Sequence, residues 1–338
     1  MSARARVVAF VVIMVALVAS AGFYVLREGN EVRAERAAEP AAPQTPVAEV
    51  VDGPRIVFRH TGIDKEYGVV AIVPLDDPGG ARAFTGVTCD RVAARDSGAS
   101  CLVTETGVVS AFKVQEFDQD WKQVASTDLP GIPSRTRLSP DGTLVASTVF
   151  VSGHSYTSLD LSTGTEIHEF GGGKSWGNLE DFALVIDGRR VRPRDRNIWG
   201  VTFVDDQSFY ATVATGGEKY LVEGDLTDRT LTSVADGVEC PSISPDGTRV
   251  AFKADVDPGR PVVWQLAVMD LGTGKRTVLA NSPRGVDDQV EWLDDDTLLY
   301  GMPRDDEPGV TDVWSLGTTA DATPELLIEQ AWSPTVVR

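Results

Sequence analysis

The chain has 338 residues, with 31 Lys and Arg against 50 Asp and Glu, so its formal net charge is −19 at pH 7. A chain this acidic repels phosphate backbones, which argues against nucleic acid as a partner. Apolar residues make up 42% of the sequence, which excludes wholesale disorder, while three cysteines and three histidines are too few for a dense disulfide scaffold, a four-cysteine zinc site or chemistry that relies on several histidines.

The first element is an uncharged, mostly apolar run over residues 7–26, preceded by Arg4 and Arg6. Twenty helical residues span about 30 Å, the thickness of the bilayer hydrocarbon. The leading basic residues favour a cytoplasmic location for residues 1–6 and export of the chain beyond the apolar run. An uncleaved single-pass anchor and a signal peptide cleaved after Ala21 both fit, and a buried helix is a third interpretation. The first two predict that the rest of the chain lies outside the cell, held at the cell membrane or secreted.

A segment rich in Ala, Pro and Glu follows at residues 27–54, and we expect it to be a semi-extended, solvated linker. From residue 55 to residue 338 the sequence reads as short strands and turns. Two near-copies of S-P-D-G-T, at residues 139–143 and 244–248, each precede an apolar strand. Pro presets φ for the second turn position and Gly accepts the positive φ that joins two strands, so each copy predicts a tight turn.

A second recurrent element, a hairpin between the next two strands, is predicted downstream of each copy. The motif D-L-x-T-G stands at residues 160–164 and 270–274. Looser versions are found at residues 74–77, 117–121, 225–229 and 314–318. The six hairpins are spaced at intervals of roughly 42 to 65 residues, and such a period with four strands per repeat is typical of a β-propeller. We therefore predict an all-β fold, a six-bladed β-propeller of four-stranded blades.

The two ends of the repeat region predict how the ring closes. Residues 331–338 look like the first strand of a blade and residues 55–59 like its second strand, so together they would complete one blade and remove an exposed edge. The predicted blades are 55–86 with 331–338, 87–130, 131–170, 197–236, 237–280 and 286–330. Residues 171–196 remain as an insertion with five arginines. It is either a solvated hairpin whose charges pair with acidic loops or a docking element for an anionic partner.

The S-P-D-G-T strands and D-L-x-T-G hairpins resemble those of the TolB-like six-bladed propellers of the bacterial envelope, over about 280 residues. The resemblance implies the propeller, with its WD-like repeats, and a location in the envelope. TolB has an α/β domain before its propeller, whereas here a membrane segment and a linker stand in that place. The same repeat occurs in the propellers of prolyl-oligopeptidase-like enzymes, so it indicates fold better than function.

Motifs for catalysis and metal binding are weak. Residues 173–177 match G-x-S-x-G, but a nucleophile elbow needs a strand before it, a helix after it and a later histidine, and none follows His168. The acidic clusters lack the spacing of an EF-hand and read as solvated turns. These clusters are Asp255 with Asp257, Asp287 with Asp288, Asp294 to Asp296 and Asp305 to Glu307. We predict no catalytic residues, no metal site and no cofactor.

The cysteines are predicted to form one disulfide. Cys89 and Cys101 flank what reads as the first hairpin of the second blade, so the two strands would bring them close together, and export permits the bond. Cys240 is left over before Pro241 in an innermost strand. We expect it to be a small buried apolar residue without a nearby histidine to activate it.

The remaining candidate site is one mouth of the central channel, where the innermost strands begin. Their charged, amide and aromatic side chains suit recognition of a polar ligand or a partner loop, although they could equally satisfy one another around a water-filled tunnel. By strand register, the residues at this mouth are Arg91, Arg135, Asn197, Trp199, Glu239, Asp288 and Gln289. We expect Arg135, Glu239 and Asp288 to lie at the same end of the channel.

The sequence thus predicts a non-catalytic, extracytoplasmic, monomeric propeller that binds an envelope protein or a polar envelope ligand. The anchor helix, where it is not cleaved, would hold it at the membrane. The alternative is a propeller enzyme, a lyase or a metal-assisted hydrolase, with its site at the channel mouth. Three carboxylates converging on one point of the channel would favour the metal enzyme, whereas paired charges would favour the binding module.

Overall fold

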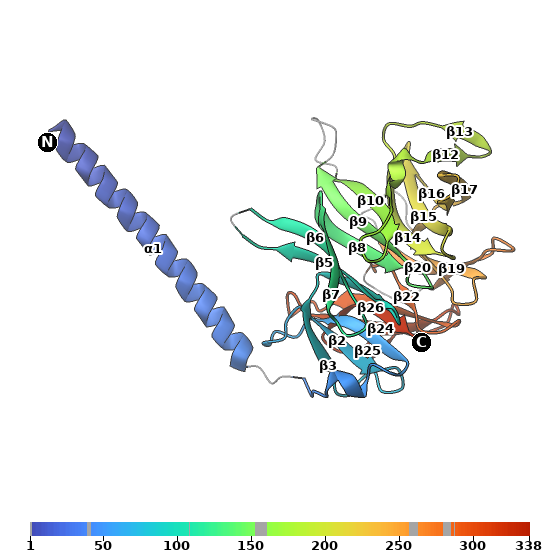
Figure 1. The fold of residues 1–338 in the computed structure, drawn as a ribbon, viewed down its shortest axis with the longest axis horizontal. Helices are drawn as coiled ribbons and strands as arrows, with labels where there is room; N and C mark the ends of the chain where they lie inside the picture. The colour runs from blue at the N-terminus through green and yellow to red at the C-terminus, as the bar shows by residue number, and fades with distance from the viewer. Residues whose placement is uncertain are drawn as a thin grey trace.

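The computed structural model describes residues 2–38, 42–107, 109–152, 161–256, 263–279, 285–286 and 288–338. In these residues, helix α1 (Ala3–Ala38) precedes six sheets arranged as the blades of a propeller (Figure 1). Five of the sheets have four strands and one has six. The six-bladed all-β propeller predicted from the repeats is confirmed.

The strands of each blade run antiparallel from the axis outward. In the first three blades they are β26 (Ala331–Val337), β1 (Arg55–His60), β2 (Val69–Pro74) and β3 (Ala83–Thr88); β4 (Arg91–Arg95), β5 (Gly98–Glu105), β6 (Ala111–Phe117) and β7 (Gln123–Leu129); and β8 (Ile132–Leu138), β9 (Leu144–Ser152), β10 (Leu161–Glu169) and β11 (Ser175–Asn178). In the last three they are β14 (Asn197–Phe203), β15 (Ser208–Thr215), β16 (Glu218–Asp225) and β17 (Thr230–Asp236); β18 (Glu239–Ile243), β19 (Arg249–Asp255), β20 (Trp264–Asp270) and β21 (Arg276–Leu279); and β22 (Glu291–Trp292), β23 (Thr297–Pro303), β24 (Thr311–Gly317) and β25 (Glu325–Ile328).

The ring closes as the sequence predicted, with β26 as the innermost strand of the first blade. It pairs with β1 in antiparallel register, with Ile56 opposite Val336 and Val57 opposite Thr335. Side chains from both faces of this blade enter the core, because a blade is covered by a neighbour on each side. Phe58 is fully buried and lies in one apolar cluster with Leu299 of the sixth blade.

The S-P-D-G-T segments form the predicted turns between first and second strands. In the first copy Gly142 has a φ of 72°, and its N–H donates to the Ser139 carbonyl at 2.9 Å. The Asp141 carboxylate accepts from the Thr143 N–H at 3.1 Å and from the Thr143 hydroxyl at 2.8 Å. The second copy repeats these bonds around Asp246, so the turn chemistry is intrinsic to the motif.

The hairpin expected at residues 160–165 is wrong. Residue 160 lies outside the described residues, and residues 161–165 lie inside β10, which pairs with β9 along its whole length. Thr163 and Thr165 are β-branched residues that suit a strand. The third blade turns later, at the glycines 171–173, where Gly171 and Gly172 adopt φ values of 85° and 76°.

The insertion is consequently shorter than predicted, because β11, inside residues 171–196, is the outermost strand of the third blade. The added element proper follows the short helix η2 (Leu179–Asp181) and consists of β12 (Ala183–Ile186) and β13 (Arg189–Val191). Strand β12 pairs in parallel with β17, so this hairpin extends the fourth blade outward to six strands.

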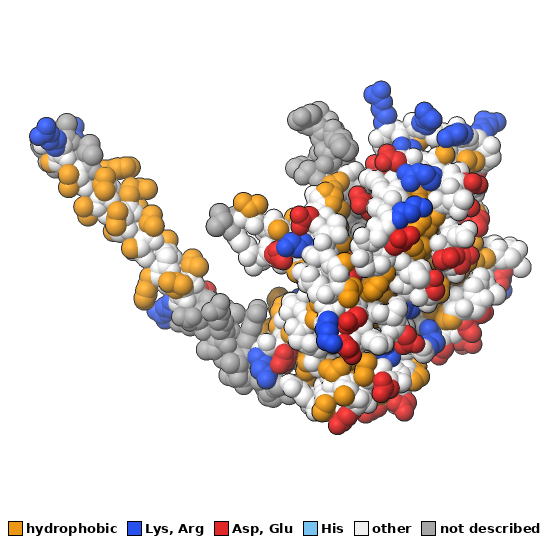
Figure 2. Space-filling model, in the orientation of Figure 1, with side chains coloured by type: hydrophobic (Ala, Val, Ile, Leu, Met, Phe, Trp, Pro, Cys, Tyr) orange, Lys and Arg blue, Asp and Glu red, His pale blue; other side chains and the backbone are white. Residues whose placement is uncertain are grey.

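The arginine-rich stretch lies in an exposed hairpin, which is compatible with both interpretations. Arg189 and Arg190 on β13 are exposed, as are Arg192 and Arg194 beyond it. Figure 2 shows basic side chains gathered over this end of the propeller, on a surface that is otherwise mostly acidic or uncharged.

Two expectations about the linker are wrong. Helix α1 continues past residue 26 to Ala38, since Ala, Arg and Glu are good helix formers. The second half of the segment lies against the first blade: the Arg82 N–H donates to the Pro43 carbonyl at 2.8 Å, and the Thr45 N–H donates to the Arg82 carbonyl at 3.0 Å. After the short helix η1 (Val47–Glu49), Val50 is buried in the core.

The apolar character of α1 agrees with the sequence. Its stretch from Arg4 to Glu28 is long and apolar enough to cross a membrane, as a signal peptide or an anchor would be. Its mean hydropathy reaches 2.5.

The cysteines pair as predicted. Cys89, just before β4, and Cys101 on β5 form a disulfide with Cα atoms 5.4 Å apart. Cys240 on β18 is free and buried.

Candidate functional site

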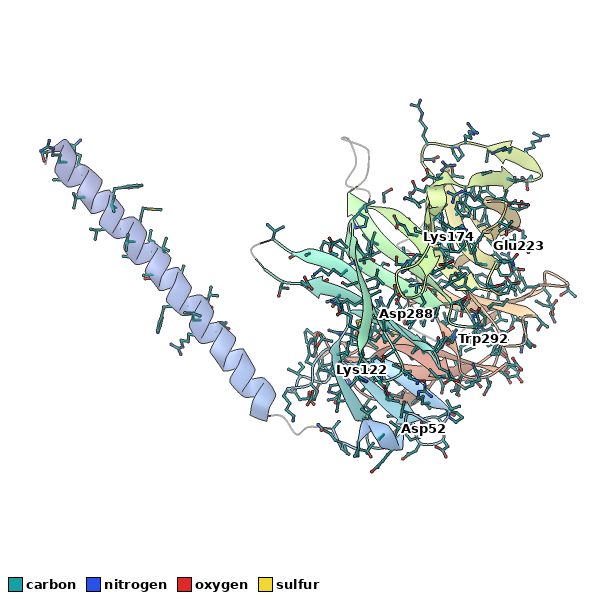
Figure 3. The ribbon with its side chains drawn as sticks, viewed as in Figure 1. Asp52, Lys122, Lys174, Glu223, Asp288 and Trp292 are labelled. Carbon is teal, nitrogen blue, oxygen red and sulfur yellow. A yellow bond between two sulfur atoms is a disulfide. The ribbon has the colours of Figure 1, made fainter. Side chains whose placement is uncertain are left out.

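The channel of the propeller is lined by the innermost strands, and a charged tier crosses it near the start of those strands. The Asp288 carboxylate is buried and accepts from the Arg91 guanidinium at 3.2 Å, while the Arg135 guanidinium lies 3.9 Å away. Asp288 also accepts from the Gly301 N–H at 3.1 Å, which holds it against the second strand of its own blade. Arg91 stacks over the Trp332 ring at 4.5 Å. Asp288 is labelled in Figure 3, near the middle of the ring of blades.

Gln289 braces three blades to one another. Its side-chain amide donates to the Val201 carbonyl at 3.1 Å and to the Pro241 carbonyl at 2.8 Å. These carbonyls belong to the innermost strands of the fourth and fifth blades, whereas Gln289 belongs to the sixth. Both amide hydrogens are thereby used, which makes Gln289 a positioning residue rather than a free recognition group.

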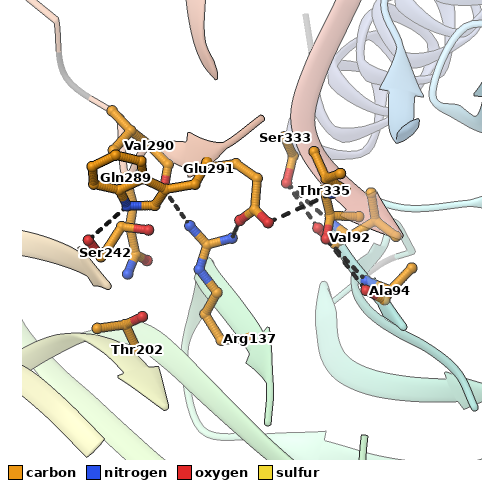
Figure 4. Close-up of polar contacts among 12 residues, drawn as sticks. Val92, Ala94, Arg137, Thr202, Ser242, Gln289, Val290, Glu291, Ser333 and Thr335 are labelled. Atoms are coloured by element: carbon orange, nitrogen blue, oxygen red, sulfur yellow. Dashed lines mark hydrogen bonds and ion pairs between the residues drawn. The ribbon is translucent and has the colours of Figure 1, made fainter. Parts of the chain in front are cut away.

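A second charged tier lies further along the axis (Figure 4). The Arg137 guanidinium donates to Glu291 at 2.7 Å and to the Val290 carbonyl at 2.7 Å. Around it, the Ser333 hydroxyl donates to the Val92 carbonyl at 3.1 Å, which ties the first blade to the second. Charged and hydroxyl groups on the axis therefore bind the blades together.

Glu239 and Asn197, which were also predicted at the mouth, are engaged by residues of neighbouring strands and blades. Glu239 is buried and held by two lysines, Lys219 and Lys253, the second at 3.4 Å. Asn197 accepts from the Ser162 hydroxyl at 2.7 Å and so joins the third and fourth blades.

Trp199 is half-buried on β14. Of the three charged residues that we expected at one end of the channel, Arg135 lies beside Asp288. Glu239 is instead engaged between the fourth and fifth blades.

The channel widens at the opposite end from the predicted mouth. The cavity among Arg91, Arg135, Asp288 and their neighbours measures only about 20 Å³, roughly the room for one water molecule. At the other end, where the innermost strands finish, a cavity of about 380 Å³ opens. All six blades line it, and its charged lining residues are Arg95, Asp96, Arg137, Asp141, Glu291 and Arg338.

Sequence reasoning missed Arg95 and Glu291 as site residues, and a signal for Arg95 existed. Arg95 is the last paired residue of its innermost strand, a position that Leu138, Phe203 and Ile243 hold in the next three blades. An arginine where three repeats have apolar residues indicates a role other than packing. No comparable signal marks Glu291, because β22 is only two residues long.

In the described part of the chain, no three His, Cys, Asp or Glu side chains gather where they could hold a metal ion. Asp257 and Asp287 of the acidic clusters, and His154, lie outside it. Among the described members of those clusters, Asp294 accepts from the Asp296 N–H at 2.8 Å, as a turn residue would.

Comparison with known proteins bears on the fold. No protein-family model and no curated protein sequence matches the chain. Among solved structures, TolB from Acinetobacter baumannii is similar, with a TM-score of 0.58 and 16% identity, over 84% of this chain and 67% of that one. The fold is that of the TolB propeller.

Other solved structures match at comparable or lower similarity. A chain of the nidogen/laminin complex has a TM-score of 0.55 and 11% identity, over 84% of this chain and 98% of that one. A puromycin-hydrolyzing peptidase of Mycobacterium tuberculosis has a TM-score of 0.49 and 14% identity, over 82% of this chain and 44% of that one, which is too low to bear on function.

Proposed function

We propose that the protein is a non-catalytic binding module of the cell envelope, with its binding site on the propeller axis. The observation that carries this proposal is the cavity of about 380 Å³ around which all six innermost strands end. Its volume falls in the range of small-molecule and peptide-loop sites, and its lining combines charged groups with Leu138 and Trp292. A partner there would contact every blade at once.

The location of the module rests on α1. An apolar helix of this length, with basic residues before it, supports a signal anchor or a signal peptide, and either would leave the propeller outside the membrane. The likeness to an envelope propeller, TolB, supports the same location. The partner would then be an envelope protein or a polar envelope ligand.

The test is capture of partners from an envelope extract by the full-length chain in detergent, with the axial cavity open or filled. Pro245 lines the cavity at an exposed turn, so Pro245→Trp should fill the entrance without disturbing the core. Lys275→Trp is the matched control, since Lys275 is an exposed turn residue of the same blade that does not line the cavity. We expect Pro245→Trp to lose the captured partner and Lys275→Trp to retain it. Equal capture by the two variants would place the binding site elsewhere.

A further inference from the structure

Arg95 forms fewer hydrogen bonds than Arg137 and Arg338, the other arginines that line the axial cavity. It ends β4 and lines the axial cavity, where it is half-buried. Within the described residues its one hydrogen bond runs from Nη1 to the carbonyl of its own neighbour, Ala94, at 2.9 Å. A guanidinium carries five N–H donors in a planar fork, so most of this group is available to a ligand.

The other two arginines of the cavity each donate two hydrogen bonds to neighbouring groups. Arg137 donates to Glu291 and to a backbone carbonyl. Arg338 donates to the Trp292 carbonyl at 2.9 Å and to the Leu293 carbonyl at 2.8 Å.

Each carboxylate of the cavity also has a hydrogen-bond or ion-pair partner. Glu291 accepts from Arg137, and Asp96 pairs with Arg55 at 3.3 Å. Asp141 accepts from Ser139 and Thr143, and although its partial burial acts in the opposite direction, these bonds hold its pKa below its ordinary value. No carboxylate among the described lining residues forms a direct ion pair with Arg95.

The surroundings of Arg95 destabilise the charged form of its guanidinium. Burial lowers the pKa of the Arg95 guanidinium below its ordinary value, Glu291 partly restores it, and the charges of Arg137 and Arg338 lower it further. A desolvated cation beside other cations is unfavourable until an anion joins it. The chain has a net charge of −19, whereas the charged lining of this cavity is balanced, with three arginines against three carboxylates.

We propose that the axial cavity binds a small molecule bearing oxyanion groups, a carboxylate or a phosphate, through a bidentate contact with Arg95. The planar guanidinium fork matches two oxygens of either group. Ser97, on the adjoining turn, also lines the cavity and offers a hydroxyl. A volume of about 380 Å³ accommodates a molecule much larger than a single anion. This inference rests on the proposed function and gives its ligand class.

The test is calorimetric titration of the full-length chain in detergent with citrate and, separately, with inorganic phosphate, at constant ionic strength. We expect saturable binding of at least one of them, citrate indicating a carboxylate ligand and phosphate a phosphorylated one. Arg95→Gln should weaken that binding at least about tenfold, since a charge-assisted bidentate contact is lost. Arg190→Gln removes an exposed arginine outside the cavity and should leave the affinity unchanged. The proposal would be overturned if neither citrate nor phosphate bound saturably. It would also be overturned if Arg95→Gln and the unaltered chain bound the anion with equal affinity.

Arg95→Lys keeps the proposal testable if Arg95→Gln does not fold. Lysine retains the charge but has no planar fork, so the affinity should fall in Arg95→Lys too. An unchanged affinity would contradict the bidentate contact. The result also separates this inference from the proposed function. Loss of partner capture in Pro245→Trp together with unchanged anion binding in Arg95→Gln would overturn the oxyanion site alone, and the reverse pattern would overturn the partner site alone.

Discussion

Arg137 and Glu291 stand 154 residues apart in the sequence, and their side chains meet at 2.7 Å on the propeller axis. Only about a tenth of each side chain is exposed, at 11% and 10%. The pair joins the third blade to the sixth across the channel, so it couples elements that share no strand pairing.

Removing one residue of this ion pair should destabilise the folded protein. We expect Glu291→Ala to lower the free energy of unfolding by about 3 kcal/mol, because it leaves the Arg137 charge buried without its carboxylate. The double variant Arg137→Leu, Glu291→Leu should lose less, since it removes both charges. Urea unfolding of the three chains measures this, and an equal loss in single and double variants would contradict the argument.

The disulfide closes a loop with a sequence separation of 12. Replacing Cys89 and Cys101 together by Ser should lower the free energy of unfolding by about 3 kcal/mol at most, because the unfolded chain regains the entropy of that loop. Mass spectrometry of the unreduced chain should find Cys89 linked to Cys101, and Cys240 should react with a thiol reagent only after unfolding. A link involving Cys240 would contradict the assignment.

Strand β26 supplies the innermost strand of the first blade, so its removal should open the ring. A chain truncated after Gln330 loses the partner of β1 and exposes an unpaired edge around Ile56. We expect this chain to aggregate, as judged by light scattering, at concentrations where the full-length chain stays dispersed. A truncated chain that remained monomeric and folded would contradict the closure as a stabilising element.

Gly200 allows two innermost strands to approach each other closely. It has a φ of 68°, and a Cβ atom built there would lie 2.8 Å from the Cys240 Cα. Gly200→Ala should therefore lower the free energy of unfolding by about 3 kcal/mol, from strain and overpacking together. Gly188, in the β12–β13 turn, has a similar φ of 72° but open space around it, so Gly188→Ala should lose only about 1 kcal/mol. Thermal unfolding of both variants tests this difference.

His60 makes stability depend on pH. It is fully buried, its Nε2 lies 3.1 Å from Asp64, and its Nδ1 accepts from Arg82 at 2.7 Å. Burial, and then the charge of Arg82, lower its pKa below the ordinary 6.5. The unfolded chain thus binds a proton near 6.5 while the folded chain does not, so the contribution of His60 is complete above 6.5 and is lost as the pH falls below it.

Urea unfolding between roughly pH 8 and pH 5 should show this decline, and His60→Gln should flatten it. Other titrating groups remain in that variant, so the comparison isolates His60. An equal pH dependence in both chains would mean that His60 titrates alike in the folded and unfolded states.

Local turn chemistry could be predicted because it depends on a few adjacent residues, and blade closure because the two ends of the repeat region each read as one strand of the same incomplete blade. The S-P-D-G-T turns follow from Pro, Asp and Gly in fixed order, whatever surrounds them. The predicted hairpin at residues 160–165 is wrong because the positive φ of this turn is supplied by Gly171 and Gly172, which lie outside the short motif.

The candidate site was harder to predict because side-chain direction on the innermost strands depends on backbone irregularities. Ser333, Gly200 and Cys240 have positive φ on three of these strands, where the pairing register shifts. Each shift redirects the residues next to it, so simple alternation cannot place Glu239, whose carboxylate meets Lys219 and Lys253 instead of the axis. The size of the cavity at the far end depends on all six strand ends together.

The β12–β13 hairpin also changes what the fourth blade presents at its periphery. By pairing with β17, it covers a strand of largely uncharged residues and makes β13, with Arg189 and Arg190 exposed, the outermost strand. Two molecules approaching through this rim would bring arginine against arginine, and the repulsion would prevent their strands from joining into one continuous sheet. The hairpin thus protects the outer edge of the six-stranded blade from pairing with a strand of another molecule.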